Sequence, residues 1–181
     1  MSFRCTLPFL AAFVLSAQPL NAAEPKGLEP IRFLIGVWTT PGGGTPGGAS
    51  GTAEFSEGLA GHIIMRKSFA EYPSSGGKAP YRHEDLMVVY VNSDSTVSAD
   101  YFDNEGHVIR YAVHAPAPGR AVFLSAATAA EPRYRLSYSL SSDGTLNGTF
   151  EVAPPGHADA FATYLTWSSK PADRREPREN R

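Results

Sequence analysis

The feature that most constrains this chain is a strict alternation of apolar and polar side chains in its second half. The apolar positions of the clearest segment are Tyr134, Leu136, Tyr138 and Leu140. Successive side chains of a β-strand point to opposite faces, so this alternation predicts a strand with one buried and one solvated face. The runs at 145–152 and 160–168 repeat the pattern. The second half of the chain is therefore expected to be antiparallel sheet.

Segments of the same kind recur along most of the chain, separated by turn residues such as Asp, Asn and Gly. The predicted strands are 37–40, 52–57, 61–71, 82–91, 96–102, 107–114, 120–127, 133–141, 145–152 and 160–168. No stretch after residue 36 has a helical period over ten residues, so the crossover helices of a parallel sheet are lacking. The pattern predicts an all-β fold, a single antiparallel up-and-down β-barrel of eight to ten strands, with a two-sheet sandwich as the alternative.

The first 23 residues are typical of a secretory signal peptide. Arg4 provides the basic segment, the apolar run 7–17 follows, and small residues stand at Ala22 and Ala23. That apolar run is well short of the ~20 residues that cross a bilayer, although a retained membrane anchor is the alternative. Signal removal would make the mature protein secreted or periplasmic, soluble, and without a membrane partner.

The remaining chain divides into a predicted linker at 24–30, a barrel domain at 31–169 and a charged, disordered tail at 170–181. The domain is expected to begin with a short helical turn over 31–35. The segment 41–51 consists mostly of Gly, Pro, Ser and Thr, which predicts a flexible loop. It lacks the Lys-Ser/Thr ending of a phosphate-binding loop.

Charge and cysteine content exclude several functional classes. A formal net charge of -2 provides no clustered basic face for nucleic acid. Cys5 is the only cysteine and would leave with the signal peptide. The mature domain would then have no thiol nucleophile, iron–sulfur cluster or cysteine-based zinc site.

The segment from Ile31 to Trp38 resembles the opening of calycin-type barrels, the superfamily of lipocalins, fatty-acid-binding proteins and nitrobindin-like haem barrels. Those proteins begin with a short helical turn and a Gly-x-Trp motif, which Gly36 and Trp38 match here. The later segment from Gly58 to His62 resembles the second-strand region of small bacterial barrels of this group. The resemblance implies that Trp38 plugs one end of the barrel and that a small hydrophobic molecule binds in the interior.

Polar side chains near strand ends are candidates for the mouth of such a cavity. His83 and Asp85 share one face of their strand, with Tyr81 beside them, whereas Glu84 lies on the other face. In the run 107–114 one face holds Arg110 and the other Tyr111, and the pattern leaves the inward face open. The candidate ligand-binding residues are Trp38, His62, Tyr81, His83, Arg110 and Tyr111.

Three alternative functions stay open from the sequence. By resemblance to nitrobindin-like barrels, His157 in the loop before the last strand is the candidate proximal ligand of a haem, the one cofactor considered. His83 and Glu84 are candidates for general acid–base work in an isomerase or hydrolase. A barrel packed solid with side chains would act through its surface as an inhibitor or structural module. No Gly-x-Ser-x-Gly motif is present, and no catalytic residue is assigned.

Overall fold

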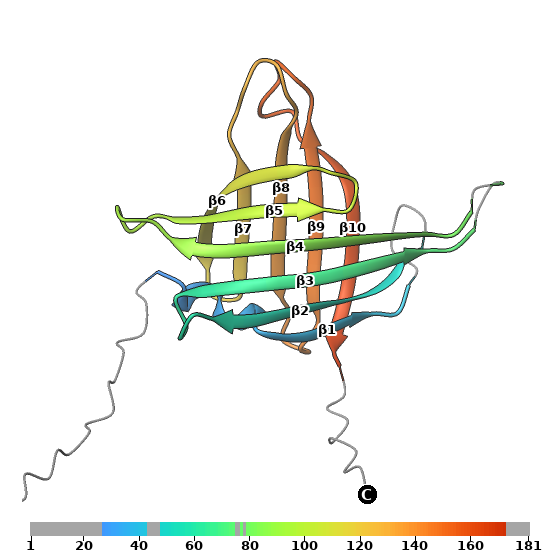
Figure 1. Ribbon diagram of the computed structural model, residues 1–181, viewed down its shortest axis with the longest axis horizontal. Helices are drawn as coiled ribbons and strands as arrows, with labels where there is room; N and C mark the ends of the chain where they lie inside the picture. Colours follow the sequence, from blue (N-terminus) through green and yellow to red (C-terminus); the bar gives the residue numbers. More distant parts are fainter. Residues whose placement is uncertain (1–26, 43–47, 75–76, 78, 173–181) are drawn as a thin grey trace, which may run out of the picture.

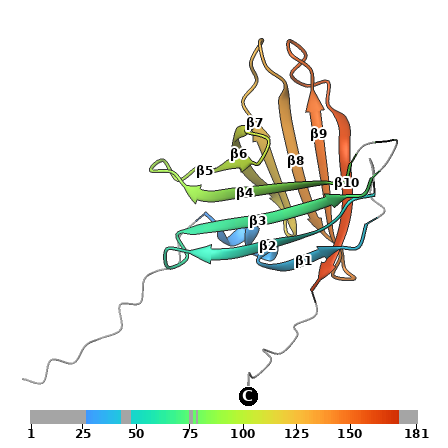
Figure 2. The same ribbon diagram turned by 45° about the vertical axis from the view of Figure 1, so that its right-hand side comes forward.

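The computed structural model describes residues 27–42, 48–74, 77 and 79–172, which form a closed antiparallel barrel (Figures 1 and 2). The elements are η1 (Glu29–Leu34), β1 (Gly36–Thr40), β2 (Ser50–Gly58), β3 (Ile63–Tyr72), β4 (Tyr81–Val91), β5 (Val97–Asp103), β6 (Val108–Ala117), β7 (Arg120–Ser125), β8 (Arg133–Leu140), β9 (Leu146–Ala153) and β10 (Ala162–Pro171). Each strand pairs with its neighbours in sequence, and β1 pairs with β10 to close the ring. The barrel is confirmed, and the alternative sandwich is not observed.

All ten predicted strand segments form strands, with ends that differ by a few residues. The predicted helical turn is the 3-10 helix η1. Leu28, within the predicted linker, is fully buried, and β10 continues to Pro171, beyond the predicted end of the domain. The predicted signal peptide and residues 173–181 of the predicted tail lie outside the described residues. The described part of the chain has no helix that is both long and apolar enough to cross a membrane.

The core lies on the inner faces of the strands, where alternate side chains meet inside the ring. Its largest fully buried side chains include Phe55, Phe123, Met87 and Leu146. The ring of Tyr138 packs edge-on against Phe55 at 5.6 Å and against Phe123 at 6.0 Å between centroids. Burial of this apolar surface stabilises the fold by roughly 25 cal/mol per Å².

One glycine allows an aromatic ring to lie directly against the backbone of the neighbouring strand. Gly148 on β9 is paired with Trp167 on β10. A Cβ atom at Gly148 would lie 2.1 Å from Cε2 of the indole. The position therefore requires glycine because of the close approach of Trp167.

One end of the barrel is closed by η1. Leu28, Ile31 and Leu34 from this segment are buried. The indole nitrogen of Trp38 donates a hydrogen bond to the carbonyl oxygen of Leu34 at 2.7 Å, within the buried core. Figure 2 shows the blue helix at this end, behind β2 and β3. Trp38 therefore lies at the closed end of the barrel.

The opposite end carries the β3–β4, β5–β6, β7–β8 and β9–β10 connections. Figure 1 shows the β7–β8 and β9–β10 connections projecting at the top, whereas the β3–β4 connection extends to the right. We call this end the open end, because the described residues include no helix across it.

The seam between β1 and β10 is the shortest strand pairing of the barrel. Its register comprises Trp38 opposite Pro171 and Thr39 opposite Lys170. A backbone hydrogen bond from Ala172 to Val37 extends it, at 2.8 Å. The other neighbouring strands pair over five or more residues each. Closure therefore depends on few backbone contacts between the two ends of the domain.

Candidate functional site

A buried ion pair lies inside the barrel near the open end. Arg66 on β3 and Asp85 on β4 have side chains that are each 7% exposed. Nη2 and Nε of Arg66 donate to Oδ1 of Asp85 at 2.6 and 3.1 Å, and Ser68 Oγ donates to Oδ2 at 2.6 Å. Desolvation of two charges costs free energy that their attraction repays only with good geometry. A charged pair in this position is thus a candidate functional feature.

Tyr138 on β8 joins this pair from across the interior, where Nη1 of Arg66 donates to its hydroxyl oxygen. Burial lowers the pKa of Arg66, but Asp85 and Tyr138 raise it, and the net pKa lies above the ordinary value. Burial also raises the pKa of Tyr138, so its hydroxyl keeps its proton. We call Arg66, Ser68, Asp85 and Tyr138 the polar centre.

A second set of polar side chains connects β4, β5 and the following turn at the open end. His83 Nε2 contacts the Tyr101 hydroxyl at 3.0 Å, and Nδ1 contacts Oε1 of Glu105 at 3.0 Å. The hydroxyl of Tyr81 also donates to Oε1 of Glu105, at 2.7 Å, and that of Tyr101 donates to Oδ2 of Asp103 at 3.2 Å. We call these five residues the rim network.

The carboxylates of the rim network are held in their ionised form. Burial raises the pKa of Asp103. Hydrogen bonds from His107 and from the backbone of Glu105 lower it by more than this, so the net pKa lies below the ordinary 3.8. Hydrogen bonds from Tyr81 and His83 lower the pKa of Glu105. The same bond to Glu105 is the largest factor that raises the pKa of Tyr81, to about 12. At neutral pH the tyrosine hydroxyls therefore act as donors to charged carboxylates.

The far wall of the open end is aromatic. Tyr134 on β8 stacks on Phe150 on β9 with centroids 5.8 Å apart and an interplanar angle of 7°. Tyr164 packs edge-on against Phe150 at 6.2 Å. Tyr164 stands at the register shift between Thr163 and Leu165 of β10, and it is 60% exposed. Such bulges re-aim a side chain at the rim of a barrel.

Two further tyrosines continue the aromatic surface onto β3 and β4. Tyr72 and Tyr81 stack with centroids 6.2 Å apart. Burial raises the pKa of Tyr72, and Tyr164 and Glu105 raise it further. Tyr72 therefore lies within electrostatic reach of both walls. The open end thus has a polar wall on β3–β5 and an aromatic wall on β8–β10.

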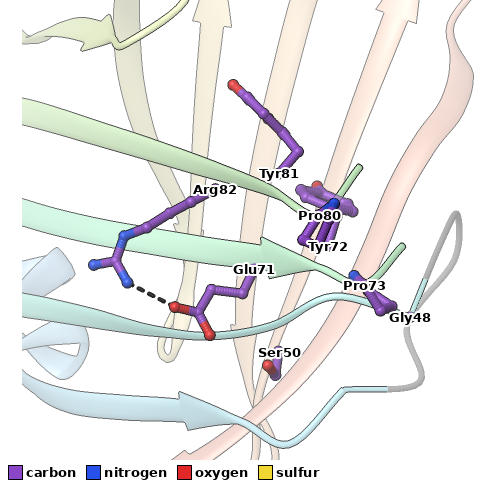
Figure 3. Close-up of a pocket in the computed structure, with 8 residues that line it drawn as sticks. All are labelled: Gly48, Ser50, Glu71, Tyr72, Pro73, Pro80, Tyr81 and Arg82. Atoms are coloured by element: carbon purple, nitrogen blue, oxygen red, sulfur yellow. Dashed lines mark hydrogen bonds and ion pairs between the residues drawn. The ribbon is translucent and has the colours of Figure 1, made fainter. Parts of the chain in front are cut away.

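An open surface pocket of about 470 Å³ adjoins this end (Figure 3). It is lined by Gly48, Ser50, Glu71, Tyr72, Pro73, Pro80, Tyr81 and Arg82. Figure 3 shows the ion pair between Glu71 and Arg82 beside it, at 2.8 Å. Both of these side chains are about half exposed, so this pair contributes little to stability.

The structure brings three of the predicted ligand-binding residues to the interior or the open end. Tyr81 and His83 belong to the rim network, and Asp85 shares their face, as the alternation predicts. Tyr111 faces inward and is 3% exposed. Trp38 lies at the closed end, away from these three.

The other predicted residues lie elsewhere. His62 is exposed on the β2–β3 turn, and His157 is exposed on the turn between β9 and β10. The Arg110 side chain is 88% exposed and faces Asp100 at 3.8 Å on the outer surface. Glu84 is also outside, where it binds Arg82 at 2.8 Å, so His83 and Glu84 are on opposite faces of β4.

Haem binding through the exposed His157 stays a prediction. Among the described residues, no group of three or more His, Cys, Asp or Glu side chains is placed to hold a metal ion.

Sequence reasoning did not predict Arg66, Tyr101, Tyr134 or Tyr138 as site residues, although it placed Tyr134 and Tyr138 on the buried face of their strand. A signal for Arg66 exists in the sequence, because it is a charged residue on the same strand face as Ile64, which is buried. Neither the protein-family models nor the curated proteins provide a match to this chain. The function is therefore inferred from the geometry of the open end.

Proposed function

We propose that this chain is a non-enzymatic binding protein for a small, mostly apolar molecule that enters the open end of the barrel. The observation that carries the proposal is the buried Arg66–Asp85 ion pair inside the barrel, together with the aromatic wall on β8–β10. Ligand sites in proteins are typically apolar and aromatic, with a few convergent polar groups that fix orientation. A buried ion pair is seldom the most stable way to fill a core, so a binding role accounts for its presence better than stability does.

The aromatic wall supplies the apolar contact area for such a molecule. Tyr134, Phe150 and Tyr164 lie one against the next on β8–β10. Aromatic pairs contribute about 0.5–1.5 kcal/mol beyond the area they bury, and a flat ligand ring would extend this series. The polar centre would then orient the polar end of the molecule.

The resemblance to calycin-type barrels supports the same proposal. The ten-strand barrel, the opening helical turn and the position of Trp38 at the closed end agree with that architecture. We include export through the N-terminal signal in the proposal, so the ligand would be met in the periplasm or outside the cell.

The proposal is tested by filling the open end. Ala70 lies on the inner face of β3 opposite His83, and Ala112 is exposed on β6. We expect the neutral dye N-phenylnaphthylamine to gain fluorescence with the wild type and with Ala112→Trp, but not with Ala70→Trp. Equal fluorescence with Ala70→Trp, or none with the wild type, would contradict binding at the open end. Circular dichroism shows whether both variants are folded.

A second measurement identifies the natural ligand class. Native mass spectrometry of protein purified from its own host should show a co-purified small molecule. Its loss from Ala70→Trp purified in the same way would place it at the open end.

A further inference from the structure

The hydroxyl of a buried tyrosine inside the barrel has no hydrogen-bond partner among the described residues. Tyr111 on β6 is 3% exposed, and its ring packs edge-on against Phe123 at 6.2 Å. Tyr111 belongs to the hydrophobic core, and no hydrogen bond of its hydroxyl is present within the part of the chain that the structure describes. The Tyr111 oxygen is not among the fully buried polar atoms without a partner, so it borders space that water or a small molecule can reach.

The polar centre next to it also has donors to spare. A guanidinium has five N–H groups, and Arg66 uses three of them, two on Asp85 and one on the Tyr138 oxygen. Tyr138 accepts that bond, and its own O–H has no acceptor among the described residues. The groups of the polar centre that still lack an acceptor among the described residues are therefore two N–H groups of Arg66 and the O–H of Tyr138.

These donors face one region of the interior. Tyr111 and Tyr138 both pack edge-on against Phe123, which lies on the strand between theirs. Burial raises the pKa of Tyr111, and after burial the strongest influences on that pKa are Arg66, which lowers it, and Tyr138, which raises it. The three groups thus act on one another across the interior.

We infer that the bound molecule presents a neutral hydrogen-bond acceptor, such as a carbonyl oxygen, to Arg66, Tyr111 and Tyr138. This inference rests on the proposed function and names the chemical class that the site selects. An acceptor oxygen would accept hydrogen bonds from hydroxyl donors that have no partner among the described residues.

The charge balance of the polar centre selects a neutral acceptor over an ion. Asp85 neutralises Arg66 at 2.6 Å, and both side chains are buried. A carboxylate would bring a second anion next to Asp85 in a medium of low dielectric constant. An ammonium group would place a second positive charge next to Arg66 in the same medium, and it could accept a hydrogen bond from none of the spare donors.

The test uses four ligands with the same ring and different polar ends. They are acetylnaphthalene, ethylnaphthalene, naphthoate and naphthylmethylammonium, all substituted at the same ring position. We expect acetylnaphthalene to bind most tightly by calorimetry, about 2- to 10-fold more tightly than ethylnaphthalene, as one neutral hydrogen bond provides.

Tyr111→Phe isolates the unpartnered hydroxyl. The variant should weaken acetylnaphthalene by about 2- to 10-fold and leave ethylnaphthalene unchanged. Tyr90→Phe is the matched control, because that hydroxyl binds Asp100 at 3.2 Å, a residue which faces Arg110 on the outer surface. It should change neither affinity. Tyr111→Phe should not lower the free energy of unfolding, since the hydroxyl has no partner to lose.

A second measurement does not depend on any variant. The infrared carbonyl band of isotope-labelled acetylnaphthalene should lie at lower frequency when bound than in an apolar solvent, because the oxygen accepts hydrogen bonds. An unshifted band would refute the inference.

The outcomes separate this inference from the proposed function. Equal binding of ethylnaphthalene and acetylnaphthalene would overturn the inference and leave binding at the open end intact. Tightest binding of naphthoate or naphthylmethylammonium would overturn it in the same way. Absence of binding by all four would also overturn it, and the dye experiment with Ala70→Trp would then decide the proposed function on its own.

Discussion

Removal of the negative charge from the polar centre is the sharpest test of how the barrel interior is stabilised. Asp85→Asn keeps the shape of the side chain but leaves the Arg66 guanidinium buried without a counter-ion. The amide also cannot accept the Ser68 hydroxyl and both Arg66 bonds as a carboxylate does. The barrel must then either tolerate an unpaired charge or admit water.

The expected cost follows from the burial of both partners. Breaking a buried ion pair from one side costs about 3–5 kcal/mol of unfolding free energy. A domain of this size loses about 2–4 °C of melting temperature per kcal/mol, so the melting temperature should fall by about 6–20 °C. The double variant Arg66→Met with Asp85→Leu removes both charges, and it should be closer to the wild type than Asp85→Asn is.

The assay is urea unfolding at neutral pH, followed by tryptophan fluorescence. Asp100→Asn is the matched control, because its partner Arg110 is exposed on the outer surface at 3.8 Å. That change should cost about 0–1 kcal/mol. A loss of less than about 1 kcal/mol for Asp85→Asn would refute the reasoning, since the pair would then be solvated rather than buried.

Three further predictions concern packing and pH. Gly148→Ala should cost about 1–3 kcal/mol in urea unfolding, because the new Cβ meets the rigid ring of Trp167; wild-type stability would contradict that contact. Trp38→Phe should cost about 1–3 kcal/mol, because the Leu34 carbonyl loses its partner at the closed end, and an unchanged urea midpoint would argue against it. The pKa of Asp103 is lower in the folded protein than its ordinary 3.8, so the ionised carboxylate stabilises the fold. This contribution is complete above pH 3.8 and is lost as pH falls through the lower folded-state pKa. The unfolding free energy, measured as pH is lowered through this range, should therefore fall less steeply for Asp103→Asn than for the wild type.

The strand pattern predicted the barrel because one face of each strand is buried. The alternation through Tyr134 and Tyr138 is a direct consequence of this burial, and both side chains face inward. Turn residues between the strands gave the neighbour pairing. The choice between barrel and sandwich depends on whether β1 reaches β10, which is a long-range contact that local patterns do not encode.

The candidate site was predictable only in part. The common face of Tyr81, His83 and Asp85 follows from strand geometry alone. The partners of these residues could not be read from the sequence. The register of β3 against β4, and the place of β8 across the interior, decide that Arg66 meets Asp85 and Tyr138. For the strand that holds Arg110, the pattern did not decide which face points inward. In the structure the face with Tyr111 points inward, so Arg110 lies on the outer surface.

The short seam between the first and last strands has a consequence for assembly. Two residue pairs hold β1 to β10, and they join positions separated by nearly the whole domain. Contacts of such high sequence separation form late, because most of the chain must be ordered before they repay the entropy of closure. A chain truncated before Ser169 would leave β1 as a bare edge with unsatisfied amide and carbonyl groups. Two such edge strands are expected to pair through backbone hydrogen bonds, so that the truncated protein associates into dimers or longer aggregates.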